Sequence, residues 1–334
     1  MSLSFRPAVL AAASLALVGP VACGDDAEVL TIYSGRQIDL IGPILERFAE
    51  ERGVDIEVRD GTTAELALLI EEEGDRSPAD VFLSQSPGAV AYLDGLGRLS
   101  DLSQSVLDAV PEEDRAPDGQ WVGLTGRVRT LVYNPELISE DELPTSVLDL
   151  TDPRYDGMIA VAPPNASFQD FVTGLRSELG EDGTGAFLEG LAANDALTFP
   201  NNVAILDAVN RGEIAMGLIN HYYWFENAVD DPDQPSRLHF FEDGDLGSML
   251  LITAASVVDT ASDPELADDL IEFLLGEEAQ TYFAEETLEY PLAAGVQPVA
   301  DLFPLDDIVS ARLDFDTLGT LDETIALIRD SGLD

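Results

Sequence analysis

The chain is poor in the residues that most metal and catalytic sites use. It has one cysteine and two histidines among 334 residues. An internal disulfide and a thiolate zinc site are therefore excluded, and a metal site built on histidines is not expected. The sequence contains no Gly-x-Ser-x-Gly elbow, no Walker loop and no carboxylate spacing typical of a glycosidase. These absences disfavour an enzyme. If the protein were an enzyme, we would expect a secreted hydrolase, which would need a base and a nucleophile that we do not find.

Positive charge is also scarce. Lysine and arginine together number 16 against 65 aspartates and glutamates, which gives a formal net charge of −49. The acids are dispersed along the chain rather than gathered in a tail. Such a surface is well solvated and repels nucleic acids and anionic membrane surfaces. We therefore expect no nucleic-acid partner, and contact with a membrane only through the N-terminus described next.

Residues 1–23 are predicted to be a lipoprotein signal peptide. A basic n-region precedes the short apolar run 8–18, and small residues stand directly before Cys23. This arrangement resembles a bacterial lipobox, in which the cysteine is lipidated, although Pro20 stands where leucine is usual. An ordinary cleaved signal peptide is the alternative. We expect residues 24–28 to form a tether, with the protein in the periplasm or on the outer face of the cytoplasmic membrane, lipid-anchored at Cys23.

After the leader, strand-like and helix-like segments alternate. The apolar runs 28–33, 54–58 and 79–83 predict strands, and the amphipathic runs 40–52 and 64–73 predict helices between them. This order is typical of βαβ units with a mainly parallel sheet. Because the chain is too long for one simple core, we predict an α/β protein of two lobes. Ligands of such sheets bind outside the carboxyl ends of the strands.

Later segments extend the same pattern and add polar groups at helix starts. The helix predicted over 168–179 follows Asn165-Ala166-Ser167, whose N–H groups could bind an anion, although a plain Asn or Ser cap is the alternative. Asn202 before a short helix is likewise either a cap or a ligand donor. The other predicted elements are extended chain over 121–133, strands over 158–161 and 249–257, and helices over 203–209 and 264–275.

The stretch Asn220-His221-Tyr222-Tyr223-Trp224 carries the clearest chemical signal. It follows the apolar run 214–219, a predicted buried strand. Neighbouring side chains on a strand point to opposite faces, so Tyr222 and Tyr223 can share one site only if the strand has already ended. A phenol has an ordinary pKa of about 10, so ionising two of them together at neutral pH needs a strong cation such as Fe³⁺. The alternative is an aromatic lid packed on the edge of the core.

Several motifs together resemble the periplasmic ferric-ion-binding proteins that feed ABC importers, over nearly the whole mature chain. The resemblance implies a type II periplasmic-binding-protein fold, each lobe a mixed, mainly parallel sheet flanked by helices, with a hinge of strands crossing near residues 110–128 and 253. It assigns 29–128 and 253–303 to lobe 1, and 129–252 and 304–334 to lobe 2. The motifs are Tyr33-Ser34-Gly35-Arg36, Ser77-Pro78-Ala79-Asp80-Val81-Phe82, Leu124-Thr125-Gly126-Arg127-Val128-Arg129 with Val132-Tyr133, Asn202 with Gly212-Glu213-Ile214, and residues 220–224.

The same resemblance implies the metal ligands. Tyr222 and Tyr223 match the paired phenolates of the family. Its histidine ligand falls on Gln37, its glutamate on Gln85, and the third tyrosine of other members on Phe168. The resemblance therefore implies only two strong protein ligands for Fe(III) in this chain.

A synergistic anion would complete such a site. Fe³⁺ with two phenolates keeps one positive charge, so added carbonate, phosphate or citrate makes the site negative, and Arg36 could neutralise it through bidentate hydrogen bonds. Arg36 could instead pair with an acidic side chain on the surface, and Gln85 could cap a helix. The anion-contact positions implied by the resemblance are Gln37, Gln85, Ser86, Asn165, Ala166, Ser167, Asn202 and Asn220.

The expected function is that of a monomeric extracytoplasmic substrate-binding protein, not an enzyme, which delivers ferric iron to an ABC permease. The alternative is the same fold with another cargo, such as thiamine, or a small organic anion such as a phosphonate or ferric citrate. In that case the aromatic stretch would stack on the organic group and Arg36 would hold its charge.

Overall fold

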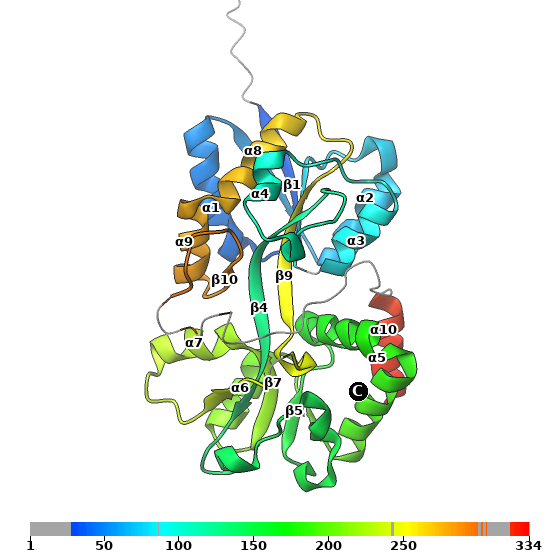
Figure 1. The fold of residues 1–334 in the computed structure, drawn as a ribbon, viewed down its shortest axis with the longest axis vertical. Helices are drawn as coiled ribbons and strands as arrows, with labels where there is room; N and C mark the ends of the chain where they lie inside the picture. Colours follow the sequence, from blue (N-terminus) through cyan, green and yellow to red (C-terminus); the bar gives the residue numbers. More distant parts are fainter. Residues whose placement is uncertain are drawn as a thin grey trace, which may run out of the picture.

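The computed structural model describes residues 28–85, 87–241, 244–299, 302, 305 and 321–333. They form two α/β lobes, one above the other in Figure 1, joined by two long strands. The predicted signal peptide with Cys23, most of the tether, and Ser86 lie outside the described residues. Within the described part, no helix combines the length and apolarity that a membrane crossing requires.

The first lobe, at the top of Figure 1, is built on a central strand flanked by two parallel neighbours. Strand β1 pairs with β2 on one side and with β3 on the other. Its elements are β1 (Val29–Ser34), α1 (Ile38–Arg52), β2 (Asp55–Asp60), α2 (Thr63–Glu73), β3 (Val81–Ser84), α3 (Pro87–Gly95), α4 (Gln104–Asp108), α8 (Pro264–Leu275), α9 (Glu277–Glu286) and β10 (Tyr290–Pro291).

The second lobe has its own sheet, in which β5 lies parallel to β6 and to β7. The C-terminal helix α10 packs against α5. The elements are β5 (Ile159–Val161), α5 (Ala166–Ala193), β6 (Leu197–Thr198), α6 (Asn202–Asn210), β7 (Met216–Asn220), α7 (His221–Asp230), β8 (Arg237–His239) and α10 (Leu321–Asp330).

Two strands, β4 (Val122–Tyr133) and β9 (Leu250–Val257), connect the lobes. The first half of β4 pairs with β9, and from Arg129 onward β4 pairs with β7 of the second lobe. Every antiparallel pair of the described strands involves β4 or β9. The sheets are mixed, as predicted, but they are parallel only among the outer strands. The sheets meet at Val128 and Leu250, and the finer lobe boundaries given above remain predictions.

The local elements follow the sequence patterns closely. In α1, Ile41, Ile44 and Phe48 lie on one buried face, and Gly53 ends the helix with φ 71°, a left-handed conformation that favours glycine. The helix predicted over 168–179 ends where expected, because Gly180 adopts a non-helical φ of 70° and ψ of 175°, a conformation that glycine tolerates. A second helical segment follows directly and reaches Ala193, and the two segments together form α5.

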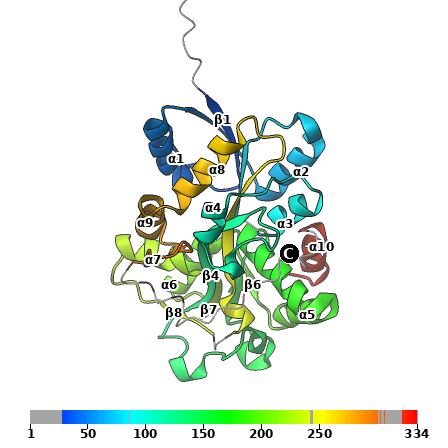
Figure 2. The same ribbon diagram turned by 45° about the horizontal axis from the view of Figure 1, so that its top comes forward.

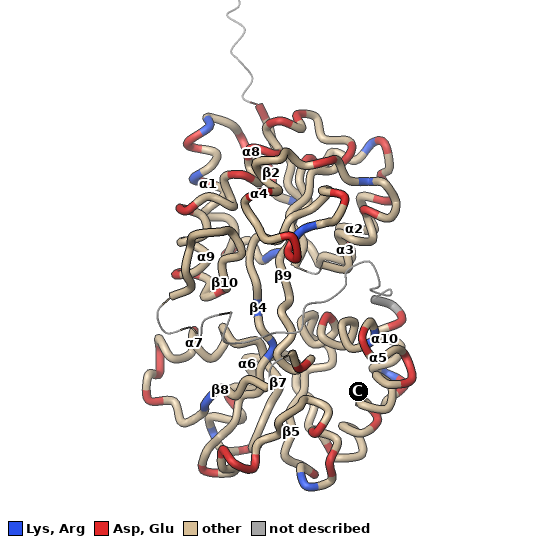
Figure 3. Tube along the Cα trace, in the orientation of Figure 1, with Lys and Arg blue, Asp and Glu red and all other residues tan. Residues whose placement is uncertain are grey.

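Charge is distributed as the composition predicts. Figure 3 shows acidic residues over the outer surfaces of both lobes. The hydrophobic cores lie beneath them, one around Phe48 and Leu270 in the first lobe and one around Phe168 and Phe171 in the second. The acids are therefore a solvated exterior around conventional cores.

Gly35, just after β1, is required by a close approach. A Cβ at this position would lie 3.0 Å from the Cα of Thr63 and would overlap the Thr63 hydroxyl. That hydroxyl accepts a hydrogen bond from the backbone N–H of Gln85 at 3.1 Å.

We expect Gly35→Ala to lower the free energy of unfolding by about 1–3 kcal/mol, because the added methyl overpacks a filled position. Denaturant unfolding would measure the change. Gly95→Ala is the matched control, since a Cβ there meets nothing within 4 Å. An unchanged midpoint for Gly35→Ala would contradict the packing argument.

Candidate metal and anion site

The two tyrosines lie on the first turn of α7, directly after β7 ends at Asn220. Their ring centroids are 4.2 Å apart and the ring planes are inclined by 31°. Because the strand has ended, the two rings lie side by side instead of pointing to opposite faces. The structure therefore brings Tyr222 and Tyr223 together at one place.

The environment of Tyr222 opposes ionisation in the absence of a cation. Burial raises the pKa of Tyr222 well above 10, and the neighbouring Tyr223 raises it further, whereas Arg127 acts in the opposite direction. A phenol with such a pKa stays protonated at neutral pH. Its oxygen could become a phenolate only when a strongly charged cation binds beside it.

Arg129 is a positive group close enough to interact with both phenols. It lies opposite Asn220 in the β4–β7 ladder and is fully buried. Burial lowers its pKa to about 10, and the nearby Tyr223 and Tyr222 act against this lowering. Its guanidinium donates to Asn220 Oδ1 at 2.9 Å and packs over the ring of Phe171. A buried cation of this kind normally has an anionic partner.

Arg129 has spare donors. Within the described residues, its Nε and second terminal nitrogen are buried and make no hydrogen bond, and the same holds for Asn220 Nδ2 and Asn202 Oδ1. Buried polar atoms are rarely left unpaired unless a water, ion or ligand satisfies them. The spare donors outnumber the single spare acceptor, so the cluster suits an anion.

The helix start at Asn165 contributes to the same cluster. Asn165 caps α5 by accepting from the Ser167 N–H, and Asn202 donates to Ser167 Oγ at 2.9 Å. The contact between Arg129 and Ser167 Oγ, at 3.4 Å, links this group to the arginine. Asn201, not Asn202, caps α6, so Asn202 is free of the capping role that the sequence left open.

Arg36 takes the alternative that the sequence left open. It is buried and its terminal nitrogen contacts both carboxylate oxygens of Glu289, at 2.8 and 3.0 Å. Thr125 donates to the same carboxylate. The acidic partner is therefore internal rather than on the surface. This pair balances its own charges, while Arg36 Nε and its second terminal nitrogen make no hydrogen bond. The predicted contact of Arg36 with an anion stays a prediction.

The structure places the other positions implied by the resemblance in different surroundings. Gln85 accepts from Arg127 through its backbone carbonyl, whereas Gln37 is exposed at the start of α1. Phe168 is fully buried in the core of the second lobe, beside Phe171. Ala166 is exposed on the first turn of α5. In the part of the chain that the structure describes, no three His, Cys, Asp or Glu side chains gather as a metal site would require.

Sequence reasoning missed Arg129 and Glu289 as members of this region. Arg129 was detectable, because two arginines at alternate positions within an apolar strand are unusual for an interior segment. Glu289 had no local signal, since its partner Arg36 is 253 residues away in the chain.

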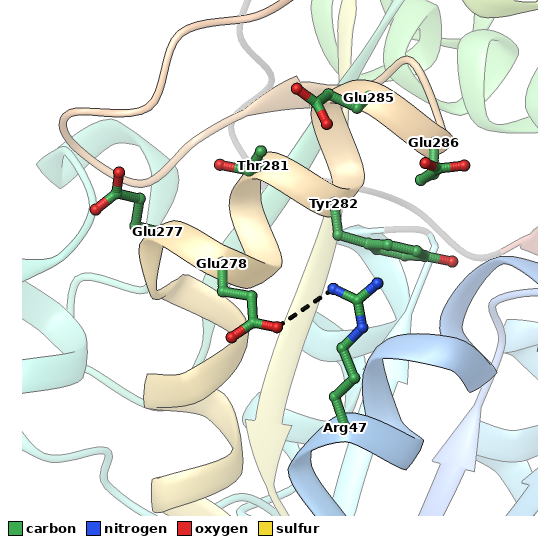
Figure 4. Close-up of a pocket in the computed structure, with 7 residues that line it drawn as sticks. All are labelled: Arg47, Glu277, Glu278, Thr281, Tyr282, Glu285 and Glu286. Atoms are coloured by element: carbon green, nitrogen blue, oxygen red, sulfur yellow. Dashed lines mark hydrogen bonds and ion pairs between the residues drawn. The ribbon is translucent and has the colours of Figure 1, made fainter. Parts of the chain in front are cut away.

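A separate surface hollow lies on the first lobe. Figure 4 shows this space of about 530 Å³ between α1 and α9, lined mainly by glutamates together with Arg47 and Tyr282. Arg47 pairs with Glu278 at 3.3 Å across it. The hollow is open and acidic, and it shares no residue with the phenol–arginine cluster.

Comparison with known proteins gives a consistent result. Residues 76–313 match the family of bacterial extracellular solute-binding proteins. The major ferric iron-binding protein of Neisseria meningitidis is 30% identical over 340 residues, covering all of both chains.

Two solved structures are similar throughout. Iron-bound HitA from Pseudomonas aeruginosa is 33% identical with a TM-score of 0.84, covering 91% of this chain and 99% of HitA. The Trichodesmium protein IdiA (FutA), solved with iron and citrate, is 25% identical with a TM-score of 0.79, covering 92% of this chain and all of that one. This chain therefore belongs to the bacterial extracellular solute-binding proteins, and its predicted kinship with the periplasmic ferric-ion-binding proteins is confirmed.

Proposed function

We propose that the protein is the extracytoplasmic substrate-binding component of an ABC importer. It would bind ferric iron between the lobes through the phenolates of Tyr222 and Tyr223, together with a synergistic anion, and would deliver it to the permease. The observation that carries this proposal is the stacked pair of phenols beside a buried arginine with spare donors. The similar proteins reported above support it, because their names describe ferric iron binding or bound iron.

The charge balance favours Arg129 over Arg36 as the anion partner. Fe³⁺ with two phenolates carries one positive charge, and a carbonate, phosphate or citrate reverses its sign. The chain contains no lysine, so its 16 lysine-or-arginine positions are all arginines. Each arginine has two nitrogens that make no hydrogen bond, but the charge of Arg36 is balanced by Glu289, whereas Arg129 donates to the neutral side chains of Asn220 and Ser167. Ser167, Asn202 and Asn220 would complete the donor set.

Delivery needs a protein that can open and close. Only β4 and β9 pass between the two sheets among the described strands, so a small change at Val128 and Leu250 would rotate one lobe against the other. Closure over the iron would present a distinct surface to a permease. Periplasmic location, lipid attachment at Cys23 and a monomeric state are further parts of this proposal.

The test is a visible absorption titration of the metal-stripped protein with ferric citrate, with and without added carbonate. Phenolate–Fe³⁺ bonds give a charge-transfer band, which a purely organic cargo would not give. A saturable band would support the proposal. No band at saturating iron would overturn it and favour the alternative, in which the same tyrosines and Arg129 hold a small organic anion.

Arg129→Gln should weaken iron binding by about 10- to 100-fold, a range typical of partners outside the ligand shell, and should remove the response to added carbonate. The physical reason is that the anion would lose a buried positive group beside the phenols, together with the two nitrogens of that group that make no hydrogen bond. Competition with citrate would measure the affinity. Arg154→Gln, at an exposed arginine of the second lobe, is the control. Retained anion dependence in Arg129→Gln would contradict the assignment.

A further inference from the structure

His221 occupies an unusual position directly before Tyr222. It is fully buried, and both ring nitrogens contact backbone groups. The Val128 N–H donates to Nδ1 at 3.1 Å, and Nε2 lies 2.9 Å from the Leu288 carbonyl oxygen. An N–H can only donate and a carbonyl can only accept, so the imidazole must be neutral, with its proton on Nε2. The ring thus forms a specific bridge between two backbone segments.

On one side, His221 extends the strand ladder with a side chain. Asn220 is the last residue of β7 to pair with β4, and its partner is Arg129. The next residue of β4, Val128, turns its N–H to the imidazole instead of to another strand. The chain can therefore leave the sheet and enter α7 at once, without leaving that buried N–H unsatisfied.

On the other side, His221 reaches the first lobe. Leu288 lies between α9 and β10, and β10 belongs to the sheet of that lobe. Figure 1 and Figure 2 both place α7 next to α9. The ring of Tyr290 lies 4.8 Å from the imidazole. The helix that carries the two tyrosines is therefore bonded to the opposite lobe through this one side chain.

Leu288 is strained. Its φ of 55° is one of two positive values among the described residues other than glycine. An aliphatic side chain in this region is a genuine outlier, and such strain persists only where surrounding contacts enforce it. The bond from His221 is one such contact, because it fixes the direction of the Leu288 carbonyl.

The usual means of fixing a helix start is absent from α7. Asn220 stands at the cap position, but its side chain makes no capping bond because Oδ1 accepts from Arg129. An uncapped first turn would be free to fray. The bridge through His221 takes over this task at the turn that carries both phenols.

We propose that His221 is the positioning residue of the metal site, which fixes the first turn of α7 between the β4 junction and the Leu288 segment and so sets where Tyr222 and Tyr223 stand relative to Arg129. This inference rests on the proposed function. It concerns placement only, since the imidazole is fully used by backbone groups and has no lone pair left for a metal.

Two substitutions at this position separate positioning from general stability. Glutamine can also accept at one atom and donate at the other, so His221→Gln should bind iron within about threefold of the wild type, a difference of under 1 kcal/mol. His221→Leu fills the space without either bond. It should bind iron about 10- to 100-fold more weakly and shift the charge-transfer band. If the leucine variant does not fold, His221→Asn, which can reach one of the two backbone groups, should give an intermediate loss.

His239→Gln is the matched control. This second histidine also contacts a backbone carbonyl, that of Pro144 at 2.8 Å, but it lies on β8 and its contact stays within the second lobe. Melting temperature, iron affinity and band position would be measured for each variant. We expect the control to keep the wild-type band whatever its melting temperature.

A leucine variant with wild-type affinity and an unshifted band would overturn this inference while leaving the proposed function intact. An equal loss in His239→Gln would also overturn it, because the effect would then follow stability alone. No band in the wild-type protein would overturn the proposed function and this inference with it.

Discussion

Tyr222→Phe should eliminate most of the visible iron band and weaken ferric-ion binding by more than about 100-fold, because a direct ligand contributes more than the outer-shell groups whose loss costs 10- to 100-fold. The substitution keeps the ring and its contact with Tyr223, whose centroid is 4.2 Å away. It removes only the oxygen that would become the phenolate. The titration with ferric citrate described above measures both the band and the affinity.

Tyr155→Phe is the control for this experiment. Tyr155 is buried in the second lobe and donates to the Glu142 carbonyl at 2.9 Å. Loss of that hydroxyl should affect stability while leaving the band unchanged. A Tyr222→Phe protein with a full band at wild-type affinity would show that Tyr222 is not a ligand.

The second large effect concerns folding. Glu289→Gln should lower the free energy of unfolding at pH 7 by about 3–5 kcal/mol, because it leaves Arg36 buried without its counter-charge. Both groups of the pair are buried, and Thr125 adds a hydrogen bond to the same carboxylate. Denaturant unfolding of the metal-free protein would give the value.

The pH dependence of this effect has a definite sign. Burial alone would raise the pKa of Glu289, but Arg36 and then Arg127 outweigh it, so the pKa is lowered. A carboxyl group with a lowered pKa stabilises the fold above its unfolded pKa of about 4.3, and that contribution disappears as the pH falls through the lower folded value. The difference between wild type and Glu289→Gln should therefore be constant near neutrality and shrink in acid below about pH 4.

An exposed ion pair provides the control. Glu213 pairs with Arg211 at 2.7 Å on the surface, where solvent screens the interaction. Glu213→Gln should change stability little. If Glu289→Gln were equally mild at pH 7, the buried pair would not have the structural importance argued here.

Much of the site was predictable from sequence because its first requirement is local. The apolar run before Asn220 forms a strand that ends at Asn220, and the two tyrosines follow almost immediately. Whether the two side chains share one site therefore depends on a few neighbouring residues. The helix and strand pattern was readable for the same reason, as in α1, where periodic apolar residues and Gly53 define one face and the end. Gly180 is a further example, since its non-helical conformation ends the first helical segment of α5 at the predicted place, although a second segment follows directly.

The sequence by itself determined many of the elements, the paired phenols and the family. The tertiary structure alone decided which charges meet. No local pattern shows the partner of either arginine, yet Arg36 meets Glu289 from 253 residues away and Arg129 donates to Asn220 and Ser167 near the tyrosines. A buried charge takes whichever partner the fold brings within hydrogen-bond distance, and this choice depends on how β4 and β9 join the two sheets. The contact from His221 to Leu288 arises in the same way, because no local pattern relates a helix start to a loop of the opposite lobe.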